Sequence, residues 1–300
     1  MRILVTGASG FVGRAVVTQL RASGHDLRIL SRRRPAPECG ADWSAGSILE
    51  PDSLSQAFIG VDAVVHLVGI ISEIGGQTYE RVHVEGTVNV LDGARSAGVS
   101  RVVHMSALGT RPDARSRYHR SKWEAEQRVR ESGLEWTIFR PSLIYGPGDG
   151  FVTLFARMAR VSPVLPVIGP GTNQLQPVAV EDVARCFAAS VPVRECLSRT
   201  FDVCGRERFT MDEVLTLILE ATGRSRGRIH LPWAVAGLQA RALEALVPAM
   251  LGKAPPLNRD QILMLQEDNI GDPEPACQMF GFEPVRFREG IRRFLAMVAD

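Results

Sequence analysis

The chain begins with a short apolar segment that runs directly into a glycine-rich turn. Residues 3–5 are Ile, Leu and Val, a run without helical periodicity, and residues 6–10 are small or polar. A helical pattern starts at Phe11. The order strand, glycine turn, helix predicts a phosphate site, because the amino end of such a helix offers free N–H groups and a partial positive charge.

Each of the three glycines in this turn has its own expected role. Gly7 can take a positive φ, Gly10 lets the backbone approach a pyrophosphate, and Gly13 lets the helix pack closely on the strand. The spacing is G-x-x-G-x-x-G and not the standard G-x-G-x-x-G, so an ordinary glycine-rich turn is the alternative. The position directly after the first strand favours a dinucleotide site. The contacts expected here are Gly7, Ser9, Gly10, Phe11, Val12 and Gly13.

The end of the second predicted strand bears on the choice of cofactor. NAD-selective sites usually carry an Asp or Glu there, which binds the ribose 2′-hydroxyl. This chain instead has Ser31 followed by three arginines and no acid. Guanidinium groups pair well with a 2′-phosphate, so NADP(H) is favoured over NAD(H), with Arg32 and Arg33 as the contacts. The alternative is a solvated basic turn.

Apolar strands alternate with helical patterns over the first half of the chain. We expect strands at residues 3–5, 27–30, 41–43, 61–69, 101–105 and 135–139, and helices at 12–22, 51–58, 77–97 and 116–131. This alternation predicts an α/β fold with a Rossmann-type, doubly wound parallel sheet. Ligands bind at the carboxyl ends of such strands. Further cofactor contacts are therefore expected at Ser47, Ile48, Leu67, Val68, Gly69 and Pro141.

The composition changes after Arg140, where prolines and glycines interrupt this rhythm. We predict a dinucleotide-binding domain at 1–145 and a smaller C-terminal α/β lobe at 146–300, interleaved with the first and lying across the site. Helices near 180–190 and 210–222 flank a strand near 200–203. Tyr145 and the glycine-rich loop after it are candidates for lining a substrate cleft.

Residues 231–250 form the most apolar stretch of the chain. Gln239, Arg241 and Glu244 interrupt it, which argues against a membrane span. A helix in the core of the lobe is the favoured interpretation. A helix at a membrane surface or on a protein partner is the alternative.

The composition excludes several other classes of protein. The 300 residues are 45% hydrophobic with a net charge of +2, which is ordinary for a globular chain and gives no indication of nucleic-acid binding. The five cysteines lack metal-type spacing and are expected to be reduced thiols, so no metal is predicted. Since the first strand starts at residue 2, no secretory leader is expected and a cytoplasmic location is predicted, with peripheral contact at the inner membrane left open.

Tyr118 and Lys122 form the strongest candidate for chemistry. They lie four residues apart in the helix after the fifth strand and so share a face. A nearby ammonium is expected to lower the pKa of the phenol, and Lys122 can also bind the nicotinamide ribose. Such a tyrosine can exchange a proton with a substrate while a hydride moves. The alternative is a surface pair. Ser106, at the end of the fifth strand, is the candidate oxyanion donor.

Several motifs together resemble the short-chain dehydrogenase/reductase superfamily, in its NAD-dependent epimerase/dehydratase branch. They are the glycine turn, the strand ending at Gly69, His83–Thr87, Tyr118-x-x-x-Lys122, Arg140–Gly148 and Gln176–Ala184. Residues 66–71, 103–109 and 116–122 look closest to an atypical group that includes the NAD(P)H-binding accessory subunit of respiratory complex I and its bacterial relatives. That resemblance implies a firmly held dinucleotide and partners in respiration or ubiquinone synthesis.

Two positions depart from the catalytic pattern of the superfamily. Ala107 aligns with the usual catalytic hydroxyl, and His83 aligns with the helix asparagine that supports a proton relay. Our leading hypothesis is therefore an NADP(H)-binding protein linked to complex I or quinone metabolism, with weak or no turnover. The alternative is an active NAD(P)-dependent reductase or epimerase/dehydratase that acts on a small carbonyl or sugar-type substrate through Tyr118, Lys122 and Ser106.

Overall fold

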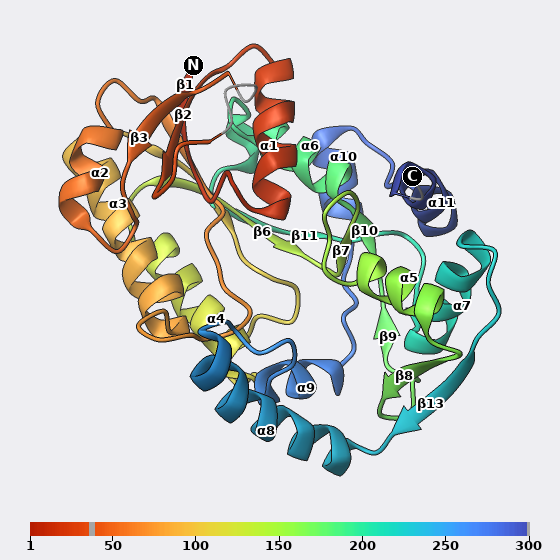
Figure 1. The fold of residues 1–300 in the computed structure, drawn as a ribbon. Helices are drawn as coiled ribbons and strands as arrows, with labels where there is room; N and C mark the ends of the chain where they lie inside the picture. Colours follow the sequence, from red (N-terminus) through yellow and green to blue (C-terminus); the bar gives the residue numbers. More distant parts are fainter. Residues whose placement is uncertain (36–39, 299–300) are drawn as a thin grey trace.

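A seven-stranded parallel sheet forms the centre of the computed structural model, which describes residues 1–35 and 40–298 (Figure 1). Its strands are β1 (Arg2–Thr6), β2 (Asp26–Ser31), β3 (Asp42–Ala45), β4 (Ala63–His66), β5 (Arg101–Met105), β6 (Glu135–Pro141) and β11 (Arg199–Val203). Their spatial order is β11-β6-β5-β4-β1-β2-β3. Because β2 and β4 both pair with β1, the strand order reverses at the carboxyl end of β1, where ligands bind in such sheets.

Helices cover both faces of the sheet. On one face lie α1 (Phe11–Ala22), α6 (Val180–Ser190) and α10 (Glu274–Phe280), and on the other lie α2 (Pro51–Ala57), α3 (Gly86–Ser96) and α4 (Arg117–Arg130). The continuous apolar run of β1 is buried on both sides, since Ile3 and Val5 face the first layer while Leu4 faces the second. The predicted Rossmann-type fold is confirmed.

The helix predicted at 77–97 is a composite. It starts with a π-helical turn, η2 (Glu80–Glu85), and continues as α3. Single π-helical turns frequently mark functional sites. Here the turn carries His83, whose ring points to the loop after β4. The strand predicted at 61–69 ends at His66, and the following loop runs at the carboxyl edge of the sheet.

Short elements after residue 141 build the smaller lobe. They are β7 (Ile144–Tyr145), β8 (Val164–Ile168), β9 (Gln174–Leu175), β10 (Val178–Ala179), β12 (Phe209–Thr210), β13 (Gly227–Leu231), α5 (Val152–Val161), α7 (Met211–Ala221), α8 (Trp233–Leu251), α9 (Arg259–Leu265), α11 (Phe287–Val298) and the 3₁₀ turn η3 (Arg194–Cys196). The strands form three pairs, β7 with β10, β9 with β12 and β8 with β13. Although α6 and β11 come from the second half of the chain, they belong to the sheet layers. The division at residue 145 stays a prediction.

The favoured interpretation of residues 231–250 is wrong. This stretch forms α8, but only Ala236 and Ala240 of that helix are buried. By length and composition alone α8 could cross a membrane: an 18-residue stretch of it has a mean hydropathy of 1.3, and 11% of that stretch is buried. An apolar sequence reports a preference for burial, but the tertiary structure leaves most of this helix uncovered.

Four of the cysteines are buried free thiols: Cys186, Cys196, Cys204 and Cys277. The expectation for Cys39 lies outside the described residues. Within residues 1–35 and 40–298, no group of three or more His, Cys, Asp or Glu side chains is arranged to hold a metal ion.

Candidate active site

The glycine turn is so tight that two of its glycines leave no room for a Cβ atom. Gly7 has a φ of +80°, and a Cβ there would lie 2.9 Å from the carbonyl carbon of Leu67. A Cβ on Gly13 would lie 2.1 Å from the oxygen of Gly7. The turn, the first turn of α1 and the loop after β4 are therefore in direct backbone contact.

The amino end of α1 is free to receive a phosphate. Gly10 is the N-cap residue, no side chain caps the helix, and its first turn has no acidic residue. The Gly10 N–H donates to the Gly7 oxygen at 3.1 Å, and Arg14 donates from Nη1 to the Ser9 oxygen at 3.0 Å. Uncapped N–H groups next to a guanidinium suit a pyrophosphate, so these residues fit a dinucleotide.

The other predicted cofactor contacts lie around this turn and at neighbouring strand ends. Leu67 and Val68 lie against Gly7. Arg32 and Arg33 follow β2 with exposed side chains. The Ser47 N–H donates to Ser53 Oγ at 3.0 Å, and buried Ile48 accepts a hydrogen bond from Asn89 Nδ2 on its oxygen at 2.8 Å. Pro141 is buried at the end of β6. The role of each in binding stays a prediction.

Lys122 is buried at the carboxyl edge of the sheet. Its ammonium donates from Nζ to the Met105 oxygen at 3.0 Å, directly before Ser106. A Cβ on Gly69 would lie 3.0 Å from the same Nζ, so the cation lies against this glycine. Burial lowers the pKa of Lys122 to about 8, while Glu126 opposes the shift.

Tyr118 sits one turn before Lys122 on α4, among other aromatic rings. It makes edge contacts with His83 (ring centroids 5.4 Å apart), with Tyr79 (5.9 Å) and with His119 (5.3 Å). Burial raises the pKa of Tyr118 to about 12. The expectation that Lys122 lowers this pKa is wrong here, because desolvation penalises the phenolate and the lysine donates to a backbone oxygen.

His83 joins the loop after β4 to α4. Its Nε2 accepts from the Ile70 N–H at 3.0 Å, so Nδ1 must carry the proton, and Nδ1 donates to Ser121 Oγ at 2.8 Å. Ser121 Oγ then donates to the backbone carbonyl oxygen of Tyr118 at 2.8 Å. Burial, with Lys122 nearby, lowers the pKa of His83 to about 2, so the ring is neutral. Through Ser121, the neutral His83 ring thus fixes the position of the Tyr118 backbone.

A second buried histidine supports the first. His66 is hydrogen-bonded through Nδ1 to Thr6 Oγ1 (2.7 Å) and through Nε2 to Thr87 Oγ1 (3.1 Å). The Thr87 hydroxyl donates to the backbone oxygen of His83, so in its contact with His66 it must accept, and His66 donates from Nε2. This network ties the end of β1 to the helix that carries His83.

Ser106 has a hydroxyl neighbour that the sequence analysis missed. Its Oγ lies 3.4 Å from Thr110 Oγ1, and both residues are buried. The spacing of four residues between the two hydroxyls was visible in the sequence. However, only the loop conformation after β5 brings them together. The site thus has two hydroxyls despite Ala107.

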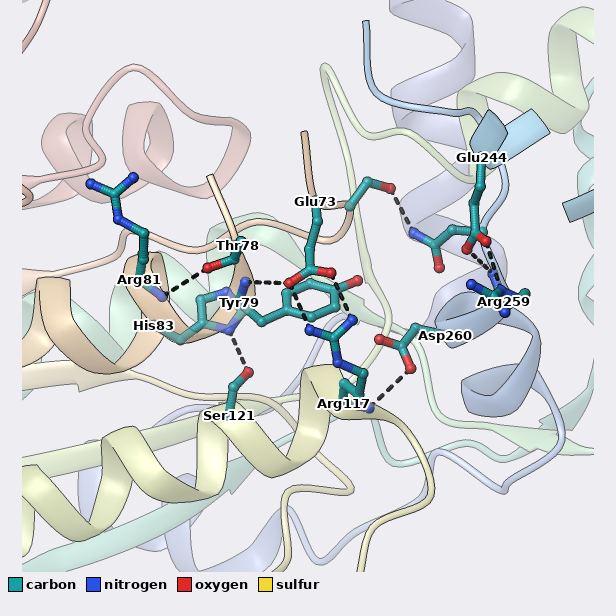
Figure 2. Close-up of polar contacts among 12 residues, drawn as sticks. Glu73, Thr78, Tyr79, Arg81, His83, Arg117, Ser121, Glu244, Arg259 and Asp260 are labelled. Carbon is teal, nitrogen blue, oxygen red and sulfur yellow. Dashed lines mark hydrogen bonds and ion pairs between the residues drawn. The ribbon is translucent and has the colours of Figure 1, made fainter. Parts of the chain in front are cut away.

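Residues from distant parts of the chain meet around Arg117, which directly precedes Tyr118, as Figure 2 shows. Glu73 forms a double hydrogen bond with Arg117 (2.8 and 3.1 Å), and its carboxylate also accepts from the Tyr79 N–H. Asp260 of α9 accepts from the Arg117 N–H at 2.9 Å. The hairpin of α8 and α9 therefore closes the edge of the site next to Tyr118. Neither Glu73 nor Asp260 carries a sequence signal for this role.

Tyr145 does not belong to this group of side chains. It is buried in the core of the lobe, where its ring centroid lies 5.0 Å from that of Phe287. The expectation that it lines a substrate cleft is wrong. A Cβ on Gly290 would overlap its hydroxyl, which shows how closely α11 covers it.

Comparison with known proteins adds independent evidence on the family of the chain. Residues 3–202 match the model of the NAD dependent epimerase/dehydratase family. A 2-alkyl-3-oxoalkanoate reductase of Stenotrophomonas maltophilia is 30% identical over 100% of both chains. A ceramide reductase of Caulobacter vibrioides is 31% identical over 77% of this chain and 73% of its own.

Two further similarities are more distant. The mitochondrial NADH dehydrogenase [ubiquinone] 1 alpha subcomplex subunit 9 of Arabidopsis thaliana is 27% identical over 88% of this chain and 68% of its own. Among solved structures, the UDP-glucose 4-epimerase of Thermotoga maritima superposes with a TM-score of 0.77 at 20% identity, over 100% of both chains. At that identity the likeness concerns the fold alone.

Proposed function

Because the chain belongs to the NAD dependent epimerase/dehydratase family, we propose that it is an active NAD(P)-dependent reductase of a carbonyl substrate. The observation that carries the proposal is the position of Tyr118 on α4, one helical turn before the buried Lys122 at the carboxyl edge of the sheet. With a pKa raised to about 12, the phenol is protonated at neutral pH. That is the state in which it can give a proton to a carbonyl oxygen.

Lys122 makes that proton transfer easier. With a pKa of about 8 it is mostly charged at pH 7, and it is held at the site by Met105 and Gly69. The ammonium is proposed to bind the nicotinamide ribose and so orient the ring, and to offset the negative charge that develops on the substrate oxygen as it takes the proton from Tyr118. A reduced nicotinamide, when bound, supplies the hydride that the carbonyl carbon accepts. Ser106 and Thr110 are the hydroxyls proposed to hold the carbonyl oxygen.

The residues around α1 are proposed to hold the cofactor. The free N–H groups after Gly10 and the guanidinium of Arg14 suit the pyrophosphate. Arg32 and Arg33, exposed after β2, favour a 2′-phosphate and hence NADP(H). No described acidic side chain stands at the end of β2 to repel it.

For the substrate we propose a carbonyl beside an alkyl chain. The two reductases named above act, by their names, on a 2-alkyl-3-oxoalkanoate and on ceramide, and both of these molecules carry alkyl chains. In this chain Ile71, in the loop between Gly69 and Glu73, is a large apolar side chain that remains 52% exposed. An exposed isoleucine beside the site suits an alkyl chain better than a sugar diphosphate.

A link to respiratory complex I remains the second candidate. It is favoured by Ala107 at the position of the usual hydroxyl and by the Arabidopsis relative, which is less similar than the two reductases. In that case the protein would hold its dinucleotide without turning it over.

The test is oxidation of NADPH and of NADH by the purified protein with 3-oxoalkanoate esters of increasing chain length. We expect turnover that rises with chain length and falls roughly a hundredfold or more in Tyr118→Phe. Tyr145→Phe is the matched control, because it removes the same hydroxyl from a tyrosine of the lobe core. Equal rates in Tyr118→Phe and the unaltered protein would refute the role of Tyr118. Firmly held NADPH that no ester oxidises would support the complex I-type role instead.

A further inference from the structure

The outer face of α8 is an apolar stripe that no part of the described chain covers. We define this face by five exposed residues at helical spacing: Val235, Leu238, Ala242, Leu246 and Ala249. It lies opposite Ala236 and Ala240, which are buried against α9. Leu238 is 71% exposed and Leu246 is 57% exposed. Such a stripe on a folded protein marks a surface that binds something apolar.

The charges next to this face are positive. Arg241 and Lys253 are exposed and form no ion pair with any residue in 1–35 or 40–298. Glu244 is the one acid in residues 232–258, and it already forms an ion pair with Arg259. It accepts from Arg259 at the backbone N (2.8 Å) and at Nε (2.6 Å), as Figure 2 shows. Within residues 232–258, the apolar stripe is therefore accompanied by two cations that form no ion pair and by no unpaired acid.

The ends of α8 are fixed to the body of the protein. At its amino end β13 pairs with β8, and at its carboxyl end the chain returns through α9 along the same helix (Figure 1). Asn258 then donates to the Ile71 oxygen at 3.0 Å and to Ser72 Oγ at 2.7 Å. Both ends lie on one body, so α8 lies along the surface and does not cross a bilayer in this fold.

We propose that the outer face of α8 docks on an anionic lipid membrane, with the helix lying in the interface. Apolar side chains enter the acyl boundary while Arg241 and Lys253 reach the phosphate groups of the lipids. The proposed partner of this face is therefore a lipid membrane and not a protein.

A second copy of the chain fits this face less well. In a two-fold pair of antiparallel α8 helices centred on Ala242, which is the middle of the stripe, each Arg241 would lie beside its counterpart. Glu244 could not offset that repulsion, because Arg259 already holds it.

Docking in this orientation would hold the α8–α9 hairpin, which borders the site next to Tyr118, at the bilayer surface. Asn258 bonds to the loop that follows Gly69, and Asp260 bonds to the residue before Tyr118. A substrate whose alkyl chain lies in the membrane would then be close to the edge of the site that carries Tyr118. This consequence rests on the proposed function, whereas the docking itself does not.

The test is flotation of the full chain with vesicles of phosphatidylcholine, with and without phosphatidylglycerol. We expect binding that requires the anionic lipid, weakens with salt and falls roughly tenfold or more in the double variant Leu238→Gln, Leu246→Gln. Arg241→Gln with Lys253→Gln should abolish the preference for phosphatidylglycerol. Leu154→Gln is the matched control, because Leu154 is a leucine of α5 that is 51% exposed.

Two readouts separate the outcomes. Reduction of a short, water-soluble ester should be the same in the double leucine variant as in the unaltered protein, which also shows that the variant folds. Absence of vesicle binding would overturn the proposal. So would a dimer in sedimentation that the double variant breaks, because the face would then belong to a second copy. Vesicle binding without any reductase activity would sink the proposed function and leave the docking intact.

Discussion

Gly13 offers the sharpest test of the cofactor site. A Cβ at this position would lie 2.1 Å from the Gly7 oxygen and 2.7 Å from Ala8 Cα. A carbon and a carbonyl oxygen normally approach to about 3.3 Å, so Gly13→Ala must push the turn and α1 apart by about 1 Å. Both neighbours are backbone atoms, which cannot rotate out of the way. Overpacking of this kind costs about 1–3 kcal/mol of unfolding free energy.

The same shift should weaken cofactor binding. The amino end of α1 holds the pyrophosphate only if its N–H groups point at it, and one lost hydrogen bond to a charged group costs about 2 kcal/mol. We therefore expect the Kd for NADPH to rise roughly thirtyfold. Quenching of protein fluorescence measures the Kd, and chemical denaturation measures the stability.

Gly237→Ala supplies the matched control. Gly237 also lies within a helix, but apart from its chain neighbours and the backbone of its own helix no described atom comes within 4 Å of the position that its Cβ would take. The same substitution there should leave the Kd unchanged and raise stability by about 0.5–1 kcal/mol, because alanine favours a helix. If Gly13→Ala bound NADPH as tightly as the unaltered protein and kept its stability, the assignment of the glycine turn would be refuted.

Three further predictions concern charged side chains. The rate of carbonyl reduction should fall as the pH rises through about 8, because the pKa of Lys122 is lowered to about 8 and its positive charge is lost above that pH. In the pH profile of kcat/KM, Lys122→Arg should move this fall to higher pH, because a guanidinium stays charged. Replacing Arg32 and Arg33 by Gln should raise the Kd for NADPH roughly tenfold and leave that for NADH unchanged, and equal effects on both would contradict the 2′-phosphate assignment. Glu126→Gln should cost about 2 kcal/mol by denaturation, because this buried carboxylate accepts hydrogen bonds from two arginines at 2.6–2.7 Å, whereas exposed Glu131→Gln should cost almost nothing.

Lys122 and Tyr118 show how far sequence reasoning reached at the site. Their spacing placed both on one face of α4, and the position after the fifth strand placed them at the carboxyl edge of the sheet. The direction of the Tyr118 pKa did not follow, because it depends on how much of the ring is buried and on the oxygen to which Lys122 donates. Neither the burial of the ring nor the acceptor of the lysine can be derived from the spacing of the two residues.

The contacts of His83 and Asp260 could not be derived in the same way. His83 meets Ser121 across 38 residues, and Asp260 meets Arg117 across 143. Each contact needs two elements to be packed in one relative position. A polar residue in an exposed-looking segment has no local property that names its partner so far along the chain.

By itself the sequence determined the alternation of strands and helices that builds most of the central sheet, because this information is local. The apolar run at residues 3–5 must be buried on both faces, and glycines at 7 and 13 permit the one turn that lets α1 return onto it. The tertiary structure alone decided that β11 closes the sheet beside β6 and that α8 keeps an apolar face in the open. Hydrophobicity states that a segment favours burial, but whether anything covers it depends on every other element of the fold.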